Sequence, residues 1–348
     1  MESENKKKVL LTGVSGFLGS HTAIQLLEKG YEVTGTLRSM KRAGEIRELV
    51  ARHTSKVGSL KFAEADLLDG QIWNELTRGI DFVQHIASPF PRELPRHEDE
   101  LIRPAREGAL NVLKAASANG VKRVVLVSSI AAVMYGREKE KRSGTYNESN
   151  WTDVTNRSDT TPYYRSKTLA ERAAWDFIAN DKSGMELVTV CPGAILGPVL
   201  ESDFGTSANM VIKMLDGSMP AFPKLGFEIV DVRSVADLLI RAMELPQAAN
   251  QRFMATAGYI SFAEIAAILR KAYPTRRIPS MSVPSFLVVL LSMFDKTLKP
   301  ILADLGATRT ADHSKALHML QWQPIPNEEA VLSCARSVTG LKIVADRK

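Results

Sequence analysis

Short hydrophobic runs alternate with longer amphipathic segments through the first half of the chain. Runs rich in β-branched residues predict six strands, within residues 8–13, 31–38, 60–67, 81–88, 121–129 and 185–193. Between them, segments with helical spacing cover residues 17–30, a charged stretch before residue 60, and residues 109–120 and 163–180. Gly30 and Gly120 each end a helical segment just before the next strand. This alternation predicts an α/β fold with a doubly wound parallel sheet.

The pattern becomes less regular after residue 193. Residues 198–228 look rich in loops, and residues 228–245 then read as a short strand followed by a helix. We therefore expect a first domain over residues 1–190, with residues 229–250 returning to it. A smaller lobe over residues 191–348 would bind the substrate.

One later stretch, residues 282–295, is strongly apolar but is interrupted by Pro284 and closed by Asp295. It is shorter than the roughly 20 residues that a membrane-spanning helix needs. We interpret it as a buried helix, with peripheral membrane attachment as the alternative, and we expect no stable membrane span.

Composition narrows the functional classes. The 348 residues are 45% hydrophobic and 24% charged, which is typical of a folded globular protein. The net charge of +6 comes from dispersed basic residues, so we expect no nucleic-acid partner, although an anionic ligand is favoured. Two distant cysteines and six scattered histidines predict neither disulfides nor a metal site. The N-terminus lacks a signal-peptide core, so a cytoplasmic location is expected.

A glycine-rich turn separates the first strand from the first helix. The sequence VLLTGVSGFLGSH places Gly13, Gly16 and Gly19 where a Rossmann fold needs a tight turn, a close approach to pyrophosphate and close helix packing. The helix beginning near Phe17 would direct its positive end at the pyrophosphate. Ser15, Phe17 and Leu18 complete the predicted cofactor-binding turn.

The end of the second strand indicates which dinucleotide is bound. Arg38 and Lys41 lie there, and no carboxylate follows until Glu45. An arginine can clamp a 2′-phosphate, whereas an acid would bind the ribose hydroxyl of NAD, so NADP(H) is the predicted cofactor. Later strand ends supply further candidates, with two residues expected near the adenine and two near the nicotinamide ribose: Asp66 and Leu67, then Ala87 and Ser88.

Two adjacent tyrosines precede a lysine in the stretch TPYYRSKTLAE. Tyr163 and Lys167 are four residues apart and would share one helix face, whereas Tyr164 lies about 100° further around the helix. An adjacent ammonium and a positively charged nicotinamide would lower the pKa of the tyrosine from its ordinary value near 10. Only one of the two tyrosines can face the cofactor.

These motifs together resemble the extended short-chain dehydrogenase/reductase superfamily. Tyr163, Ser166, Lys167, Ala170 and Glu171 match its pattern Tyr-x-x-Ser-Lys-x-x-Ala-Glu. Further segments resemble its dihydroflavonol reductase, cinnamoyl-CoA reductase and aldehyde reductase branch, among them HIASPF, RPAREGALNVLKAA, YNESNWTD, VDVRSVADL and ALHMLQWQP. The resemblance covers nearly the whole chain.

The resemblance implies a catalytic set and a reaction. Tyr163 would donate a proton, Ser129 would hydrogen-bond the substrate carbonyl, Lys167 would hold the cofactor ribose, and NADPH would deliver hydride. Pro192 and Gly193 would line the nicotinamide. The chain departs from the family pattern at three positions, none of which touches the expected chemistry: Ala109, Ser234 and Gln321.

The leading hypothesis is therefore NADPH-dependent reduction of an apolar aldehyde or ketone to an alcohol, in a reversible reaction. An NAD-dependent hydroxysteroid dehydrogenase or a nucleotide-sugar epimerase or dehydratase is the alternative on the same fold. A non-catalytic NADP(H)-sensing protein is the third reading. The expected partner is a small-molecule carbonyl substrate, and the chain would be a monomer or a homodimer that associates through helices 100–118 and 163–180.

Overall fold

The computed structural model describes residues 6–88, 97–202, 204–294 and 301–344. Its central feature is a seven-stranded sheet in the order β11-β7-β5-β4-β1-β2-β3, with every neighbouring pair parallel. The strands are β1 (Lys8–Thr12), β2 (Glu32–Leu37), β3 (Leu60–Glu64), β4 (Phe82–His85), β5 (Arg123–Val127), β7 (Glu186–Pro192) and β11 (Arg252–Ala255). The predicted doubly wound Rossmann sheet is confirmed.

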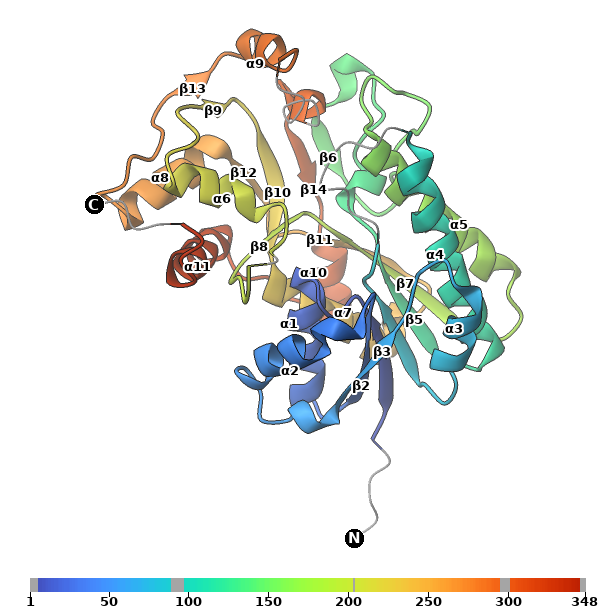
Figure 1. Ribbon diagram of the computed structural model, residues 1–348. Helices are drawn as coiled ribbons and strands as arrows, with labels where there is room; N and C mark the ends of the chain where they lie inside the picture. The colour runs from blue at the N-terminus through green and yellow to red at the C-terminus, as the bar shows by residue number, and fades with distance from the viewer. Residues whose placement is uncertain (1–5, 89–96, 203, 295–300, 345–348) are drawn as a thin grey trace.

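Helices cover both faces of this sheet (Figure 1). One face is covered by α1 (Phe17–Glu28), α2 (Ala43–Ala51), α7 (Val232–Glu244) and α10 (Ser314–Leu320), whose apolar side chains share one core with the strands. The other face is covered by α3 (Gly70–Leu76), α4 (Asp99–Ala118) and α5 (Pro162–Asn180). Since both faces are covered, the central strands β4, β5 and β7 are buried along almost their whole length.

A second, smaller sheet lies in the C-terminal lobe. It consists of β8 (Ala194–Leu196), β10 (Gly226–Asp231) and β12 (Tyr259–Ser261), and three helices pack around it: α6 (Ala208–Leu215), α8 (Phe262–Ala272) and α11 (Asn327–Gly340). Two short parallel pairs join distant segments, namely β9 (Phe222–Pro223) with β13 (Ser282–Val283) and β6 (Gly144–Tyr146) with β14 (Arg309–Ala311). The chain returns from this lobe to the main sheet through α7 and β11. The predicted division near residue 190 stays a prediction.

One sequence-based expectation about this lobe was incomplete and another was wrong. Residues 198–228 are rich in loops, as expected, but they also contain α6, whose buried Ala208, Val211, Ile212 and Leu215 follow helical spacing. The apolar stretch 282–295 does form a helix, α9 (Ser285–Leu291), but it is not buried, because most of its large side chains face solvent. No helix within the described residues is both long and apolar enough to cross a bilayer.

Candidate active site

The glycine-rich turn connects β1 to α1 with very little free space. Gly13 has a φ of +72°, and a Cβ there would lie 3.1 Å from the Cα of Ala87. A Cβ on Gly19 would lie 2.0 Å from the carbonyl oxygen of Gly13, so the helix can approach the turn only with glycine at this position. Gly16 caps α1 and supplies no side-chain acceptor for the first N–H groups of the helix. These N–H groups fit an anionic phosphate ligand.

The predicted cofactor residues lie at the carboxyl ends of the strands. Arg38 and Lys41 are exposed after β2, and Asp66 is exposed after β3 with its carboxylate accepting from the N–H of Leu68. Leu67 is half-buried near α4. Glu64, which pairs in register with Leu37, accepts from the N–H of Met40. This edge of the sheet therefore presents two exposed cations beside a carboxylate that is already hydrogen-bonded.

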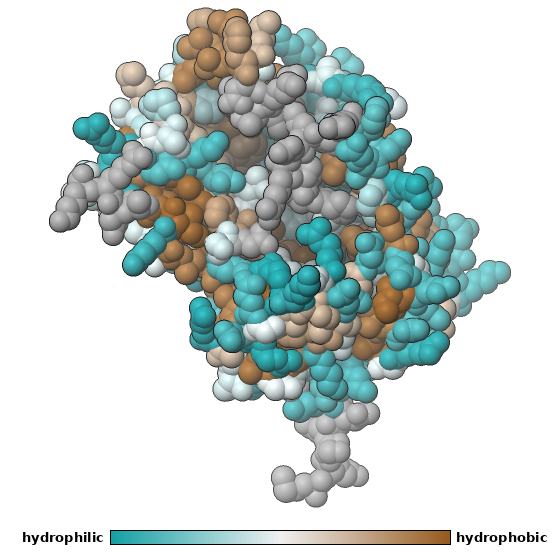
Figure 2. Space-filling model, viewed as in Figure 1, coloured by the Kyte–Doolittle hydropathy of each residue, from teal (hydrophilic) through white to brown (hydrophobic). Residues whose placement is uncertain are grey.

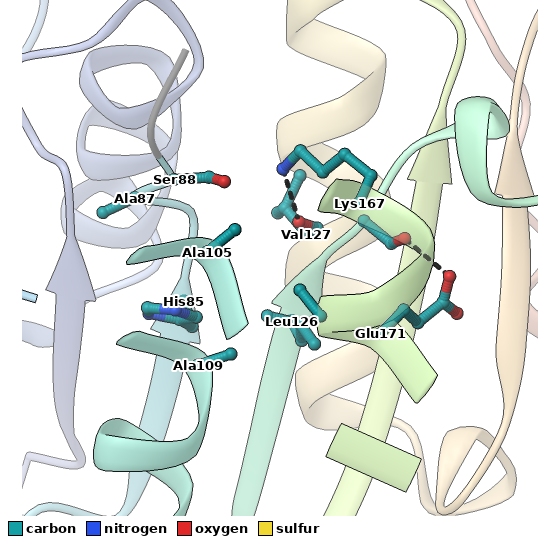
Figure 3. Close-up of a pocket in the computed structure, with 11 residues that line it drawn as sticks. His85, Ala87, Ser88, Ala105, Ala109, Leu126, Val127, Lys167 and Glu171 are labelled. Carbon is teal, nitrogen blue, oxygen red and sulfur yellow. Dashed lines mark hydrogen bonds between the residues drawn. The ribbon is translucent and has the colours of Figure 1, made fainter. Parts of the chain in front are cut away.

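A small pocket lies between the end of β4 and helix α5 (Figure 3). Ala87 and Ser88 form one wall, and Lys167 and Glu171 reach it from the opposite side. Of the predicted site residues, only Ala87, Ser88 and Lys167 line this pocket, and the others, including Ser129, Tyr163, Pro192 and Gly193, do not. Pro192 ends β7, and Gly193 follows it with its N–H donating to the carbonyl oxygen of Ala255.

Helix α5 presents the two tyrosines in different directions. The hydroxyl of Thr161 accepts from the N–H of Tyr164, and Pro162 occupies the first turn, so the helix begins one residue before Tyr163. The side chain of Ser129 lies close enough to the Tyr163 hydroxyl to oppose the rise in its pKa by hydrogen bonding. Tyr164 instead stacks on Tyr135, with ring centroids 4.0 Å apart, and its hydroxyl donates to Asp304 at 3.4 Å. Of the two tyrosines, Tyr163 is the one that lies beside Ser129, which follows β5.

Lys167 lies one turn after Tyr163 and is almost fully buried. Its Nζ donates to the carbonyl oxygen of Val127, at the end of β5, over 3.4 Å (Figure 3). Desolvation lowers the pKa of Lys167 to about 8. We refer to Ser129, Tyr163 and Lys167 as the tyrosine cluster.

The expected lowering of the Tyr163 pKa depends on bound nicotinamide as well as on Lys167, and it stays a prediction. In the chain itself, burial raises the pKa of Tyr163 to about 12, and hydrogen bonding from Ser129 opposes this rise only in part. Desolvation of the phenolate is the dominant influence on this pKa. Tyr163 is consequently protonated at neutral pH, as a proton donor must be.

A second cluster lies one turn further along α5. Glu171 is 1% exposed, and its carboxylate accepts from Ser128 at 2.6 Å, from Thr189 at 2.8 Å and from Nε of Arg252 at 2.7 Å. The Arg252 guanidinium stacks 3.8 Å from the centre of the Trp151 ring. We refer to Ser128, Glu171, Thr189 and Arg252 as the ion-pair cluster.

Sequence reasoning missed the partner of Glu171. Arg252 lies 81 residues from Glu171, and it also donates to the carbonyl oxygens of Glu148 and Asn150. The only sequence signal was a cation at the start of an otherwise apolar strand. Among the described residues, no group of histidine, cysteine, aspartate or glutamate side chains could hold a metal ion.

The model of the NAD dependent epimerase/dehydratase family matches residues 9–254. The chain belongs to this family. It is an oxidoreductase-type member of the extended short-chain dehydrogenases/reductases, and it falls in the branch that contains the cinnamoyl-CoA and aldehyde reductases.

Several relatives of this chain are reductases. It is 34% identical to cinnamoyl-CoA reductase CAD2 of Medicago truncatula, over 80% of this chain and 85% of the relative. It is 35% identical to ketoreductase azaE of Aspergillus niger, over 84% and 90% of the two chains. Yeast methylglyoxal/isovaleraldehyde reductase Gre2, solved with NADPH, superposes with a TM-score of 0.80 at 26% identity, covering 96% and 99%.

Proposed function

We propose that this chain is an NADP(H)-dependent reductase that converts an aldehyde or ketone to an alcohol. The observation that carries the proposal is the proximity of Ser129 to the Tyr163 hydroxyl, whose pKa it helps to lower, one helical turn from the buried Lys167. A protonated phenol beside a second hydroxyl group can hold a carbonyl oxygen at two points. The reductase relatives support this reading, because they cover most of the chain.

The residues present fit a dinucleotide phosphate. The cramped turn at Gly13 and Gly19 brings backbone close to any ligand above it, and the uncapped start of α1 offers N–H donors to a pyrophosphate. The exposed Arg38 and Lys41 would pair with a 2′-phosphate. Gre2 was solved with NADPH, which supports the same cofactor here. When bound, the nicotinamide would supply the hydride for the reaction.

The chain's own residues would carry the proton half of the reaction. Ser129 would orient the carbonyl oxygen, and Tyr163 would release its proton to that oxygen as the carbon is reduced. The charge of Lys167 would stabilise the phenolate that remains, because the two side chains are one turn apart on α5.

The proposed substrate is a fairly apolar carbonyl compound. The relatives are named for the reduction of cinnamoyl-CoA, methylglyoxal and isovaleraldehyde. Such molecules share a reactive carbonyl next to a small or planar carbon group. This common feature supports the reaction type, and the size of the carbon skeleton stays open.

The testing experiment measures NADPH and NADH oxidation with a panel of aromatic, aliphatic and steroid carbonyls. We expect NADPH turnover with at least one compound, and we expect Arg38→Ala to raise KM for NADPH about 10- to 100-fold while leaving KM for NADH unchanged. Arg103→Ala, on the exposed side of α4, is the control. Tight NAD binding without preference for NADP would favour the dehydrogenase or epimerase reading. Tight NADPH binding without turnover of any compound would favour a sensing role.

A further inference from the structure

Helix α9 carries its apolar stripe on the outside of the molecule. Phe286, Val289, Leu290, Met293 and Phe294 follow the i, i+3, i+4, i+7, i+8 spacing of a packed helix face. These side chains are 74%, 49%, 49%, 73% and 84% exposed. The helical hydrogen bonds continue past Leu291, since the N–H groups of Met293 and Phe294 donate to Leu290 and Leu291.

The inner face of the same helix is the less apolar one. Val288 is 4% exposed and Ser292 is 5% exposed, and the hydroxyl of Ser292 donates to the carbonyl oxygen of Val289. A helix placed to stabilise its own lobe would show the reverse arrangement. Soluble proteins seldom expose a contiguous apolar surface of this kind unless it binds something. The stripe is therefore available for a partner outside the described part of the chain.

The stripe lies at the outer end of the C-terminal lobe. Figure 1 places α9 at the extremity of the lobe, and Figure 2 shows apolar side chains gathered there on a projecting surface. A projection of seven helical residues cannot span a bilayer, but it can enter the outermost layer of one. Phenylalanine, leucine and methionine suit that apolar layer.

The charged residues near α9 indicate which kind of apolar partner this helix could bind. Residues 281–294 contain no charged side chain. The β9–β13 pair places the exposed Lys224 directly beside the start of α9, and the exposed Arg277 lies four residues before Met281, which is itself 72% exposed. An apolar tip flanked by cations is complementary to an anionic lipid surface.

We propose that α9, with Met281, Met293 and Phe294, docks this protein on an anionic membrane surface. The apolar stripe enters the lipid, and Lys224 and Arg277 meet the headgroups. A single shallow insertion of this kind gives reversible binding. The docking surface does not include the tyrosine cluster or the glycine-rich turn.

The test uses the full chain in a flotation assay with vesicles of neutral phosphatidylcholine, with or without 30% phosphatidylserine. We expect binding to the anionic vesicles that weakens with added salt and is much weaker on neutral vesicles. Phe286→Glu is expected to weaken binding at least about tenfold. Lys224→Glu is expected to weaken it about fivefold. Leu341→Glu, at another exposed leucine, is the matched control and should bind like the unaltered chain.

Circular dichroism and thermal melting of each variant separate loss of binding from loss of fold, and Phe286→Ser offers a milder substitution. Sedimentation equilibrium tests the alternative that a second copy of the chain, and not a membrane, covers the apolar stripe. The proposal is overturned if the folded chain fails to float with anionic vesicles, or if Phe286→Glu floats as well as Leu341→Glu. A dimer that Phe286→Glu dissociates, without vesicle binding, would assign the stripe to self-association instead.

Discussion

Two buried polar clusters lie against consecutive turns of α5, and they differ in how their charges are compensated. In the ion-pair cluster, the Glu171 carboxylate has Arg252 and two hydroxyl donors, all within 2.9 Å. In the tyrosine cluster, the Lys167 ammonium has, among the described residues, one hydrogen bond, which goes to a carbonyl oxygen at 3.4 Å. Burial lowers the pKa of Lys167 and raises that of Tyr163, because each charged form is poorly solvated there.

This difference distinguishes a cluster that stabilises the fold from a cluster that is suited to take part in the reaction. A buried charge with a full set of partners holds elements together, and Arg252 joins β11 to α5 and to the loop at Glu148 and Asn150. A buried ionisable group with few compensating partners has a shifted pKa, and shifted pKa values are concentrated at catalytic sites. Substitutions in the two clusters should therefore change different properties.

The largest effect is expected from Tyr163→Phe in the tyrosine cluster. Removing the proton donor should reduce kcat for carbonyl reduction by about 10²–10⁴-fold, with the fold retained. Tyr164→Phe is the matched control, because its hydroxyl contacts Asp304 and its ring stacks on Tyr135. It should retain activity and lose about 1 kcal/mol of stability. Equal loss of activity in both variants would contradict the assignment of Tyr163.

Arg252→Met should break the ion-pair cluster. It leaves the Glu171 carboxylate buried without a cation, and we expect a loss of about 3–5 kcal/mol in the free energy of unfolding at pH 7. Chemical denaturation at pH 7 measures the loss.

A surface ion pair of the same length provides the comparison for Arg252. Arg241 and Asp237 are 2.7 Å apart on α7, but each is about one third exposed. Arg241→Met should cost no more than about 0.5 kcal/mol. If both substitutions cost the same, the ion-pair cluster would not be the scaffold that its burial suggests.

Lys167→Met is expected to change the free energy of unfolding in the opposite direction to Arg252→Met. The pKa of Lys167 falls from 10.5 to about 8 on folding, so the unfolded chain binds the proton more tightly and the buried ammonium destabilises the fold at neutral pH. Replacing it with methionine should raise the free energy of unfolding by about 1–3 kcal/mol at pH 7 and abolish turnover.

The same linkage gives Lys167 a signature in the pH dependence of stability. Between pH 8 and about 10.5 the folded chain has released a proton that the unfolded chain still holds, so stability contributed by this site rises with pH. Lys167→Met should remove that rise. Lys122→Met, at an exposed position, should change stability by less than about 0.5 kcal/mol. Destabilisation by Lys167→Met would show that its packing outweighs its desolvation.

Local sequence patterns predict most of the main sheet, and the family resemblance supplies the residues of the tyrosine cluster, whose catalytic role stays a prediction. The first six strands follow from β-branched runs, and the Tyr163–Lys167 spacing follows from helical geometry. The seventh strand, β11, is only four residues long and gives no comparable signal. The turn at Gly13 was predicted from its glycine spacing, although the contact with Ala87 that makes glycine necessary comes from β4.

Properties that depend on distant contacts could not be predicted in this way. Arg252 meets Glu171 only because β11 pairs with β7, and the choice between Tyr163 and Tyr164 is reinforced by Asp304, which is 140 residues from Tyr164. The direction of the Tyr163 pKa shift also needed the surroundings of the hydroxyl. At α9 the pattern predicted the helix correctly, but spacing alone does not say which face turns outward.

The smallest expected effect is on the pH profile of reduction. Because the pKa of Lys167 is about 8, kcat/KM for NADPH should fall about tenfold between pH 7 and pH 9 as the ammonium loses its proton. Tyr163, with a pKa of about 12, stays protonated throughout this range and does not contribute. Lys167→Arg keeps the positive charge, so whatever activity it retains should stay flat to pH 9. A fall at the same pH in Lys167→Arg would assign the break to another group and remove the link between poor charge compensation and catalysis.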